Sequence, residues 1–223
     1  MAAFDCSPYR IWLLDLDGTL VDSAPDLHGA LNAVLDQHGH DIVTEDSVRD
    51  WVGAGARVLL ERALAAQHPG RAPRELGIDT LHADFLTYYE AHIADLSRPY
   101  PGVVASLERL RADGVLLGVV TNKYEGLSNR LLAALELQGH FDTVIGGDTL
   151  PERKPHASPL LEACRRLGGT AADALMVGDS ITDVRAARAA GMPVVCVSYG
   201  YNHGEDIRGV GADAVVDSLS ALF

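Results

Sequence analysis

Long hydrophobic runs are missing from this chain of 223 residues. None approaches the roughly 18–20 consecutive apolar residues that a helix needs to cross a bilayer. Residues 1–10 also lack the basic region and following apolar stretch that mark a secretory signal. We therefore expect a cytoplasmic protein that has no membrane partner.

Cysteine and positive charge are scarce as well. The three cysteines form no CxxC pair and the nine histidines show no HExxH spacing, which disfavours a disulfide framework and a zinc site. Only 18 lysines and arginines stand against 31 acidic residues, which gives a net charge of −13. Such a chain repels phosphodiester backbones, so a nucleic-acid partner is disfavoured. Any phosphate pocket must then obtain its positive charge from a metal or from a few well-placed basic residues.

Lysine is the rarer of the two basic residues, because it occurs only at Lys123 and Lys154 while arginine supplies the other sixteen cations. Lysine differs from arginine in carrying a compact, strongly hydrated ammonium group. Where a sequence uses arginine almost everywhere, a lysine can mark a position that needs this group. Chance also explains two residues, so the place of each lysine in the fold has to decide.

Short apolar runs rich in Val, Ile and Leu are the main pattern that is present. Their continuous hydrophobicity is typical of strands that are buried on both faces of a sheet. Between them lie helical patterns, several of which end at a glycine. Strands that alternate with helices predict an α/β fold with a doubly wound parallel sheet, that is, a Rossmann-like core. The runs are residues 11–17, 115–122, 143–148, 174–179 and 193–200, with residues 214–219 as a sixth, edge strand.

A long helical stretch, residues 23–97, separates the first run from the second. In LHGALNAVLDQHG and VLLERALAAQ the apolar positions recur at intervals of three and four, which indicates amphipathic helices. A simple crossover needs only one helix, so we predict an inserted helical cap domain at 23–97 and a core domain formed by 1–22 and 98–223. An insertion after the first strand lies over the C-terminal edge of the sheet, where open α/β sheets bind ligands.

Asp15 and Asp17 end the first run, in the segment DLDGT. Residues two apart on a strand point the same way, so we expect both carboxylates to project together. The alternative is a plain Asp-Gly turn, which is the commoner use of this pair. Two carboxylates that converge at a buried strand end are costly unless a cation neutralises them.

Asp179 and Asp183 follow the fourth run, in the segment GDSITD. N-terminal capping of a helix, where acidic residues are favoured by the helix dipole, explains Asp183. It explains less well why several carboxylates fall at C-terminal strand ends of one sheet. Oxygen-only ligands at such an edge suit Mg²⁺, which keeps waters and shares its coordination with a substrate phosphate.

Polar residues that can hold a phosphate follow the second and third runs. Thr121 and Asn122 end the second run, where a hydroxyl and an amide can donate to phosphate oxygens or simply form a turn. Lys154, after the third run, brings an ammonium to a carboxylate-rich edge, although a lone loop lysine is usually solvated surface. In the insertion, Arg57 follows two glycines and can meet a substrate carboxylate, with a solvated arginine as the alternative.

These motifs stand in the order that marks the haloacid dehalogenase-like hydrolase superfamily, which the chain resembles over essentially its whole length. The shared features are DLDGT, the strand-ending Thr121, Lys154 followed by proline, and GDSxxD. Within the superfamily, residues 51–64 and 197–207 are most similar to bacterial phosphoglycolate phosphatases. Each motif alone is weak, but four in this order form a specific signal.

The resemblance implies a role for each matched residue. Asp15 is the implied nucleophile that forms an aspartyl-phosphate, and Asp17 the implied acid and base. The implied Mg²⁺ ligands are the Asp15 carboxylate, the Asp17 backbone carbonyl and Asp179, with Asp183 behind them or linked through water. Thr121 and Lys154 would hold the transferring phosphoryl group.

The implied substrate is a small phosphorylated metabolite, with 2-phosphoglycolate as the first hypothesis. A sugar-phosphate phosphatase, for example one acting on N-acetylmuramate 6-phosphate, and a hexose phosphomutase remain open, as does a non-catalytic binding protein. Residues 23–97 contain no lysine, which excludes the Schiff-base amine of phosphonoacetaldehyde hydrolases. A dehalogenase is disfavoured because it needs neither Asp17 nor Mg²⁺. The sequence does not set the oligomeric state.

Overall fold

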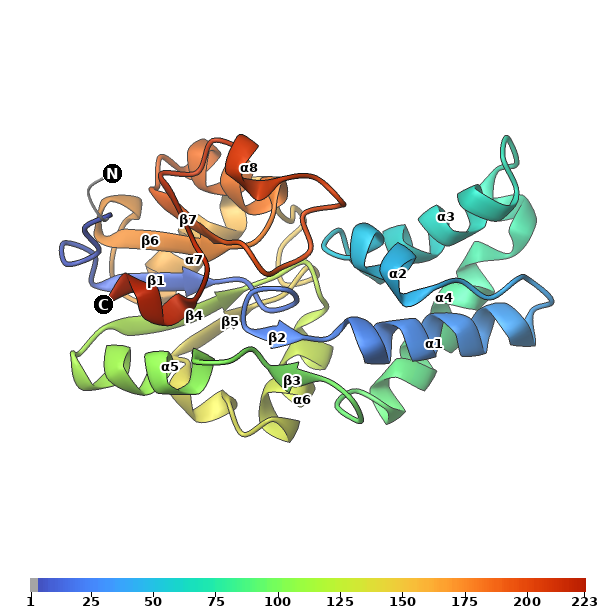
Figure 1. Cartoon of the computed structure of the whole chain (residues 1–223), viewed down its shortest axis with the longest axis horizontal. Coiled ribbons are helices and arrows are strands. Elements are labelled where there is room, and N and C mark those ends of the chain that lie inside the picture. The colour runs from blue at the N-terminus through green and yellow to red at the C-terminus, as the bar shows by residue number, and fades with distance from the viewer. Residues whose placement is uncertain (1–3) are drawn as a thin grey trace.

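A six-stranded parallel sheet forms the centre of the computed structural model, which describes residues 4–223 (Figure 1). The strand order is β5-β4-β1-β6-β7-β8, so the chain winds outward from β1 in both directions. The predicted sixth strand, β8, lies at the edge. The strands are β1 (Ile11–Leu14), β4 (Leu116–Val120), β5 (Thr143–Ile145), β6 (Ala174–Gly178), β7 (Val194–Val197) and β8 (Ala214–Val216).

Both faces of this sheet are covered, as the unbroken apolar runs predict. In β1, Trp12 and Leu14 belong to one buried cluster, whereas Ile11 and Leu13 belong to the other. This division follows from the alternation of side chains along a strand. The first cluster includes residues of α5 (Val103–Ala112) and α6 (Glu125–Ala134), and the second includes residues of α7 (Ser158–Arg166) and α8 (Ile181–Ala190).

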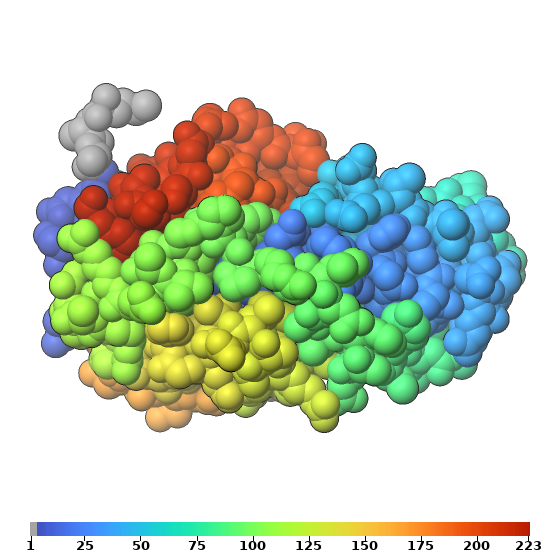
Figure 2. All heavy atoms as spheres, turned by 60° about the horizontal axis from the view of Figure 1, so that its bottom comes forward, coloured from blue at the N-terminus to red at the C-terminus, as the bar shows by residue number. Residues whose placement is uncertain are grey.

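Four further helices gather at one end of the molecule, beyond the sheet (Figures 1 and 2). Their apolar faces meet in a core that contains Leu31 of α1 and Phe85 of α4, both fully buried. The doubly wound sheet with an inserted helical part is therefore confirmed, while the exact domain limits at residues 22–23 and 97–98 stay a prediction. The helices are α1 (Ala24–Gln37), α2 (Glu45–Trp51), α3 (Ala56–Gln67) and α4 (Ile78–Ala91).

Two short strands, β2 (Val21–Asp22) and β3 (Arg98–Pro99), pair antiparallel where the chain enters and leaves these helices. The buried carboxylate of Asp26, in the first turn of α1, accepts hydrogen bonds from Leu96 N (2.9 Å), Ser97 N (2.8 Å) and Ser97 Oγ (2.6 Å). The segment that enters the helices and the segment that leaves them are thus joined by hydrogen bonds.

Short 3-10 helices complete the chain. None of the helices within residues 4–223 is long and apolar enough to cross a membrane. The 3-10 helices are η1 (Pro73–Leu76), η2 (Gln138–His140), η3 (Ala171–Asp173), η4 (Ile207–Gly209) and η5 (Leu219–Leu222).

Candidate active site

Three carboxylates meet at the C-terminal edge of the sheet. Asp15 directly follows β1 and Asp179 directly follows β6, and these two strands are neighbours in the sheet. Asp183 comes from the first turn of α8. One oxygen of each residue lies within 4.8 Å of the others, and all three side chains are buried. The structure therefore brings together three of the four acidic residues that the sequence indicates.

Lys154 lies between two of these carboxylates. Its Nζ is 2.9 Å from Asp15 Oδ1 and 2.7 Å from Asp183 Oδ1, and the residue is only 3% exposed. Asp183 Oδ2 in turn accepts hydrogen bonds from the Ser180 hydroxyl (2.7 Å) and the Ser180 backbone N–H (3.1 Å). Because its oxygens are already engaged, Asp183 is placed to orient Lys154 rather than to receive a ligand directly.

The three carboxylates of this group outnumber its single ammonium, that of Lys154. Burial raises the pKa of Asp15 to about 7, although Lys154 acts in the opposite direction. Burial likewise raises the pKa of Asp179 well above its ordinary value, and the neighbouring Asp183 and Asp15 raise it further. Burial by itself lowers the pKa of Lys154, but its two carboxylate partners outweigh that effect and the pKa is raised.

A divalent cation would lower the raised pKa values of Asp15 and Asp179, because it stabilises ionised carboxylates at close range. The donors are all hard oxygen atoms, which is the chemistry that Mg²⁺ selects. Asp15 and Asp179 fit such an ion best, since Asp183 is occupied by Lys154 and Ser180.

Asp179 is fixed from several sides. Its carboxylate accepts hydrogen bonds from the Thr19 hydroxyl and from the backbone N–H of Tyr201, both at 2.7 Å. Two glycines pack against it: a Cβ at Gly18 would lie 2.4 Å from Asp179 Oδ2, and one at Gly200 would lie 2.2 Å from Asp179 Cβ. Gly18 also has a φ of +88°, which other residues rarely adopt. Glycine is thus required at both positions for sheet and loops to approach this carboxylate.

Asp17 belongs to a second charged pair. Its carboxylate accepts hydrogen bonds from Ser23 Oγ (2.6 Å) and from Lys123 Nζ (2.8 and 3.0 Å). The strand premise holds only in part, because β1 ends at Leu14 and Asp17 lies in the following loop, although Asp15 N still donates to Val177 O of β6 at 2.9 Å. Asp15 and Asp17 therefore contact different lysines, although both line one cavity.

Lys123 is the site residue that sequence reasoning did not assign. It is 7% exposed, and its Nζ lies 4.7 Å from the ring centroid of Tyr89, which α4 contributes. Asp17 and Tyr89 raise its pKa against the effect of burial, which alone lowers it. The signal was available in the sequence, because lysine occurs only twice and both copies lie at this edge.

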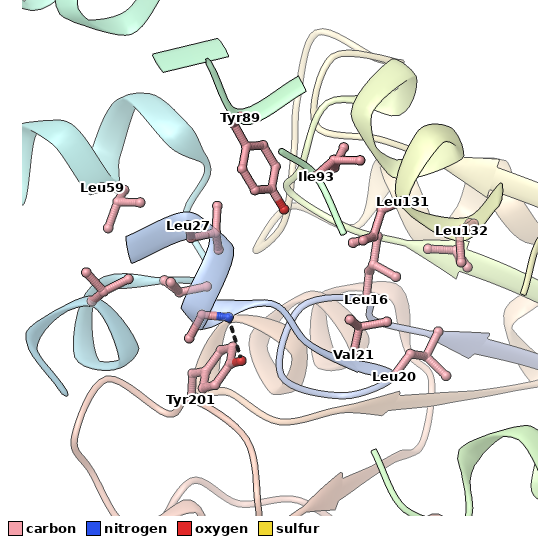
Figure 3. Packing of buried hydrophobic residues seen from close by; sticks show 14 of the residues in the cluster. Leu16, Leu20, Val21, Leu27, Leu59, Tyr89, Ile93, Leu131, Leu132 and Tyr201 are labelled. Atoms are coloured by element: carbon pink, nitrogen blue, oxygen red, sulfur yellow. Dashed lines mark hydrogen bonds between the residues drawn. The ribbon is translucent and has the colours of Figure 1, made fainter. Parts of the chain in front are cut away.

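A cavity of about 40 Å³ lies between the sheet edge and the helices. Thr121 and Asn122 line it, and Asn122 Nδ2 donates to Gly53 O and Lys154 O, both at 3.0 Å. One wall is apolar, and Figure 3 shows two of its residues, Leu27 and Leu59, near Tyr89. The lining residues are Asp15, Asp17, Leu27, Val52, Gly53, Gly55, Ala56, Leu59, Phe85, Tyr89, Thr121, Asn122, Lys123, Tyr124 and Leu127.

Arg57 is the one predicted site residue that the structure does not bring to the others. Its guanidinium lies 2.8 Å from Asp79 Oδ1 and 3.3 Å from Glu61 Oε1, and the residue is not among those that line the cavity. The Arg57 guanidinium, which was expected to meet the substrate, is thus paired with Glu61 one turn along the same helix and with Asp79 of α4.

Known proteins are similar to this chain over most of its length. Residues 12–197 match the sequence model described as haloacid dehalogenase-like hydrolase. A phosphoglycolate phosphatase of Nitrosococcus oceani is 45% identical over 93% of this chain and 92% of its own length. One of Caulobacter vibrioides is 46% identical over 92% of this chain and 85% of its own. The crystal structure of a protein from Haemophilus somnus, described as a predicted phosphoglycolate phosphatase, is 35% identical and superposes with a TM-score of 0.90 over 96% of both chains.

Proposed function

The chain belongs to the haloacid dehalogenase-like hydrolase family, and from this premise we propose that it is a cytoplasmic, magnesium-dependent phosphatase whose substrate is 2-phosphoglycolate. One observation carries the proposal. The buried carboxylate of Asp15 faces a small cavity, with Lys154 Nζ at 2.9 Å and an oxygen of Asp179 within 4.8 Å. The names of the relatives at 45 and 46% identity support the choice of substrate.

Asp15 supplies the nucleophile in this proposal. One carboxylate oxygen attacks phosphorus, so that an acyl-phosphate bond forms while the bond from phosphorus to the ester oxygen breaks. Lys154 neutralises charge on the transferring phosphoryl oxygens, and the Thr121 hydroxyl, which lines the cavity, donates to them. Asp183 keeps the ammonium of Lys154 in place through its 2.7 Å contact.

Asp17 handles the protons of both steps. Asp17 enters the reaction in its protonated form and gives that proton to the departing alkoxide. It then takes a proton from the water that attacks the acyl phosphate, which restores the protonated form. Ser23 and Lys123 hold its carboxylate at the cavity wall. The second step releases inorganic phosphate and restores Asp15.

The Asp15 and Asp179 carboxylates and the Asp17 backbone carbonyl would hold the magnesium ion. Its contribution is to neutralise the negative charge that the carboxylates and the substrate phosphate bring together. Beside the nucleophilic attack by Asp15, the residues of this chain then supply positioning, charge neutralisation and proton transfer.

A substrate panel tests the proposal. The release of phosphate from 2-phosphoglycolate, glucose 6-phosphate and N-acetylmuramate 6-phosphate is measured with Mg²⁺, and kcat/KM is compared. We expect 2-phosphoglycolate to be highest, EDTA to abolish turnover and Mg²⁺ to restore it. A sugar phosphate preferred by about tenfold, which is about 1.4 kcal/mol of transition-state binding, would refute the substrate. Full turnover after rigorous chelation would refute the metal.

A further inference from the structure

Lys123 occupies an unusual position in the cavity. Of the described residues that line it, only Lys123 carries a positive charge, while Asp15 and Asp17 carry negative charges. Arg57 is paired with Asp79, and Arg62 donates to Trp51 O at 2.6 Å, so neither of these nearby arginines lines the space. A second negative group on a substrate therefore has one cation to meet inside the cavity.

The bonding of Lys123 leaves room for such a partner. An ammonium group has three N–H donors, and the contacts to Asp17 Oδ1 and Oδ2 use two of them at most. The Tyr89 ring, 4.7 Å from Nζ, steadies the ammonium by a cation–π contact without consuming a donor. Lys123 is thus held in place and can still form a hydrogen bond to a ligand.

The spacing of the groups fits a short substrate. In the proposed reaction Asp17 meets the ester oxygen that leaves. In 2-phosphoglycolate, a single methylene carbon separates that oxygen from the carboxylate. A carboxylate so close to Asp17 must lie near the cation that Asp17 itself contacts, and that cation is Lys123, at 2.8 Å.

We propose that Lys123 binds the carboxylate of the substrate and so makes the enzyme select phosphate esters with an anionic group one carbon from the ester oxygen. This inference rests on the proposed function and adds the residue that sets its specificity. The apolar wall acts in the same direction, because Leu27, Leu59 and Phe85 offer no hydrogen-bond partners to the hydroxyl groups of a sugar.

A charge series of substrates tests the wild-type enzyme. The compounds are 2-phosphoglycolate, 2-hydroxyethyl phosphate and 2-aminoethyl phosphate, in which the distal group is anionic, neutral and cationic. We expect kcat/KM to fall in that order, with about tenfold to a hundredfold between the anionic and the neutral compound, the range of a charge-assisted hydrogen bond. Equal values across the series would overturn the proposal without the use of any variant.

Two variants assign the selectivity to Lys123. Lys123→Met removes the charge, and Lys123→Arg keeps it and serves as the matched control. Loss of the contact to Asp17 slows all substrates alike, so the readout is the ratio of kcat/KM for 2-phosphoglycolate to that for 2-hydroxyethyl phosphate. We expect Lys123→Met to lower this ratio by about tenfold or more, and Lys123→Arg to retain most of it.

The outcomes separate this inference from the proposed function. If wild type prefers 2-phosphoglycolate and Lys123→Met keeps the same ratio while both rates fall, Lys123 only positions Asp17 and the inference is wrong, whereas the proposed substrate stands. If wild type prefers a sugar phosphate, the proposed substrate itself is wrong. Should Lys123→Met fail to fold, as circular dichroism would show, the wild-type charge series still decides, because equal values across it overturn the proposal.

Discussion

Each of the two lysines is paired with one aspartate of the DLDGT segment. Lys154 contacts Asp15 at 2.9 Å and Lys123 contacts Asp17 at 2.8 Å. Because these side chains are almost fully withdrawn from water, each ammonium offsets a carboxylate that would otherwise be strongly destabilised. The pairing gives the two aspartates separate surroundings, as two different chemical roles require.

Substitution of the two aspartates distinguishes these roles. Asp15→Asn removes the nucleophile, so neither phosphoenzyme nor product is expected from any substrate. Asp17→Asn removes the proton donor and later the base, so turnover of 2-phosphoglycolate should fall by about 10²–10⁴-fold. With p-nitrophenyl phosphate, whose leaving group needs no proton, Asp17→Asn should still form the acyl phosphate and then hydrolyse it slowly.

Mass spectrometry of acid-quenched protein provides the measurement. Asp17→Asn should carry one added phosphoryl group that hydroxylamine removes, and Asp15→Asn should carry none. An equal adduct on both variants would show that Asp15 is not the nucleophile.

Sequence reasoning located most single residues of the site but not their partners. Asp15, Asp179 and Lys154 could be placed because each follows a recognisable strand and parallel strands end at one edge. The roles of Lys123 and Arg57 depend on which side chains the helices bring toward them, namely Tyr89 and Asp79. Such contacts arise between segments far apart in the sequence, and no local pattern encodes them.

Among the structural elements, β1 shows where local pattern and tertiary structure diverge. The apolar run continues to Leu16, but the strand ends at Leu14 and Leu16 N donates to Asp15 Oδ1 at 2.7 Å instead of joining the ladder. Hydrophobicity reports burial, and Leu16 is fully buried, so the pattern cannot show that the backbone has already left the sheet.

The hydrogen bonds beside the β2–β3 pair can be tested by a substitution. Asp26 in α1 joins the segment before β3 through Leu96 and Ser97. Asp26→Asn replaces an anionic acceptor and turns one oxygen into an amide donor, so buried N–H groups lose their partners. We expect the free energy of unfolding to fall by about 1–3 kcal/mol, measured by urea denaturation.

A matched control lies in the same helix. Asp36 in the last turns of α1 is exposed, and Asp36→Asn should change the free energy of unfolding by about 0.5 kcal/mol at most. Equal effects of the two substitutions would show that the Asp26 contacts do not stabilise the junction between sheet and helices.

The protein as a whole carries a net charge of −13 and yet buries several carboxylates at one edge of its sheet. In the metal-free protein, burial raises the pKa of Asp15 from 3.8 to about 7, and the pKa of Asp179 is raised as well. Between pH 3.8 and about pH 7, the folded state keeps a proton on Asp15 that the unfolded chain has released. The stabilisation from Asp15 is therefore complete below pH 3.8 and is lost as the pH rises through about 7, and the raised pKa of Asp179 acts in the same direction.

Magnesium should reverse this trend. The ion competes with protons for the same carboxylates, so it binds more tightly when they are ionised, and binding stabilises the folded state. We expect saturating MgCl₂ to raise Tm more at about pH 8 than at about pH 5, measured by calorimetry with NaCl of equal ionic strength as the control. Asp179→Asn, which removes one proposed ligand, should lose most of the increase at the higher pH. An increase in Tm that is equal at both pH values would mean that magnesium binds elsewhere. Only ligands that lose protons between about pH 5 and about pH 8 make magnesium binding stronger at the higher pH.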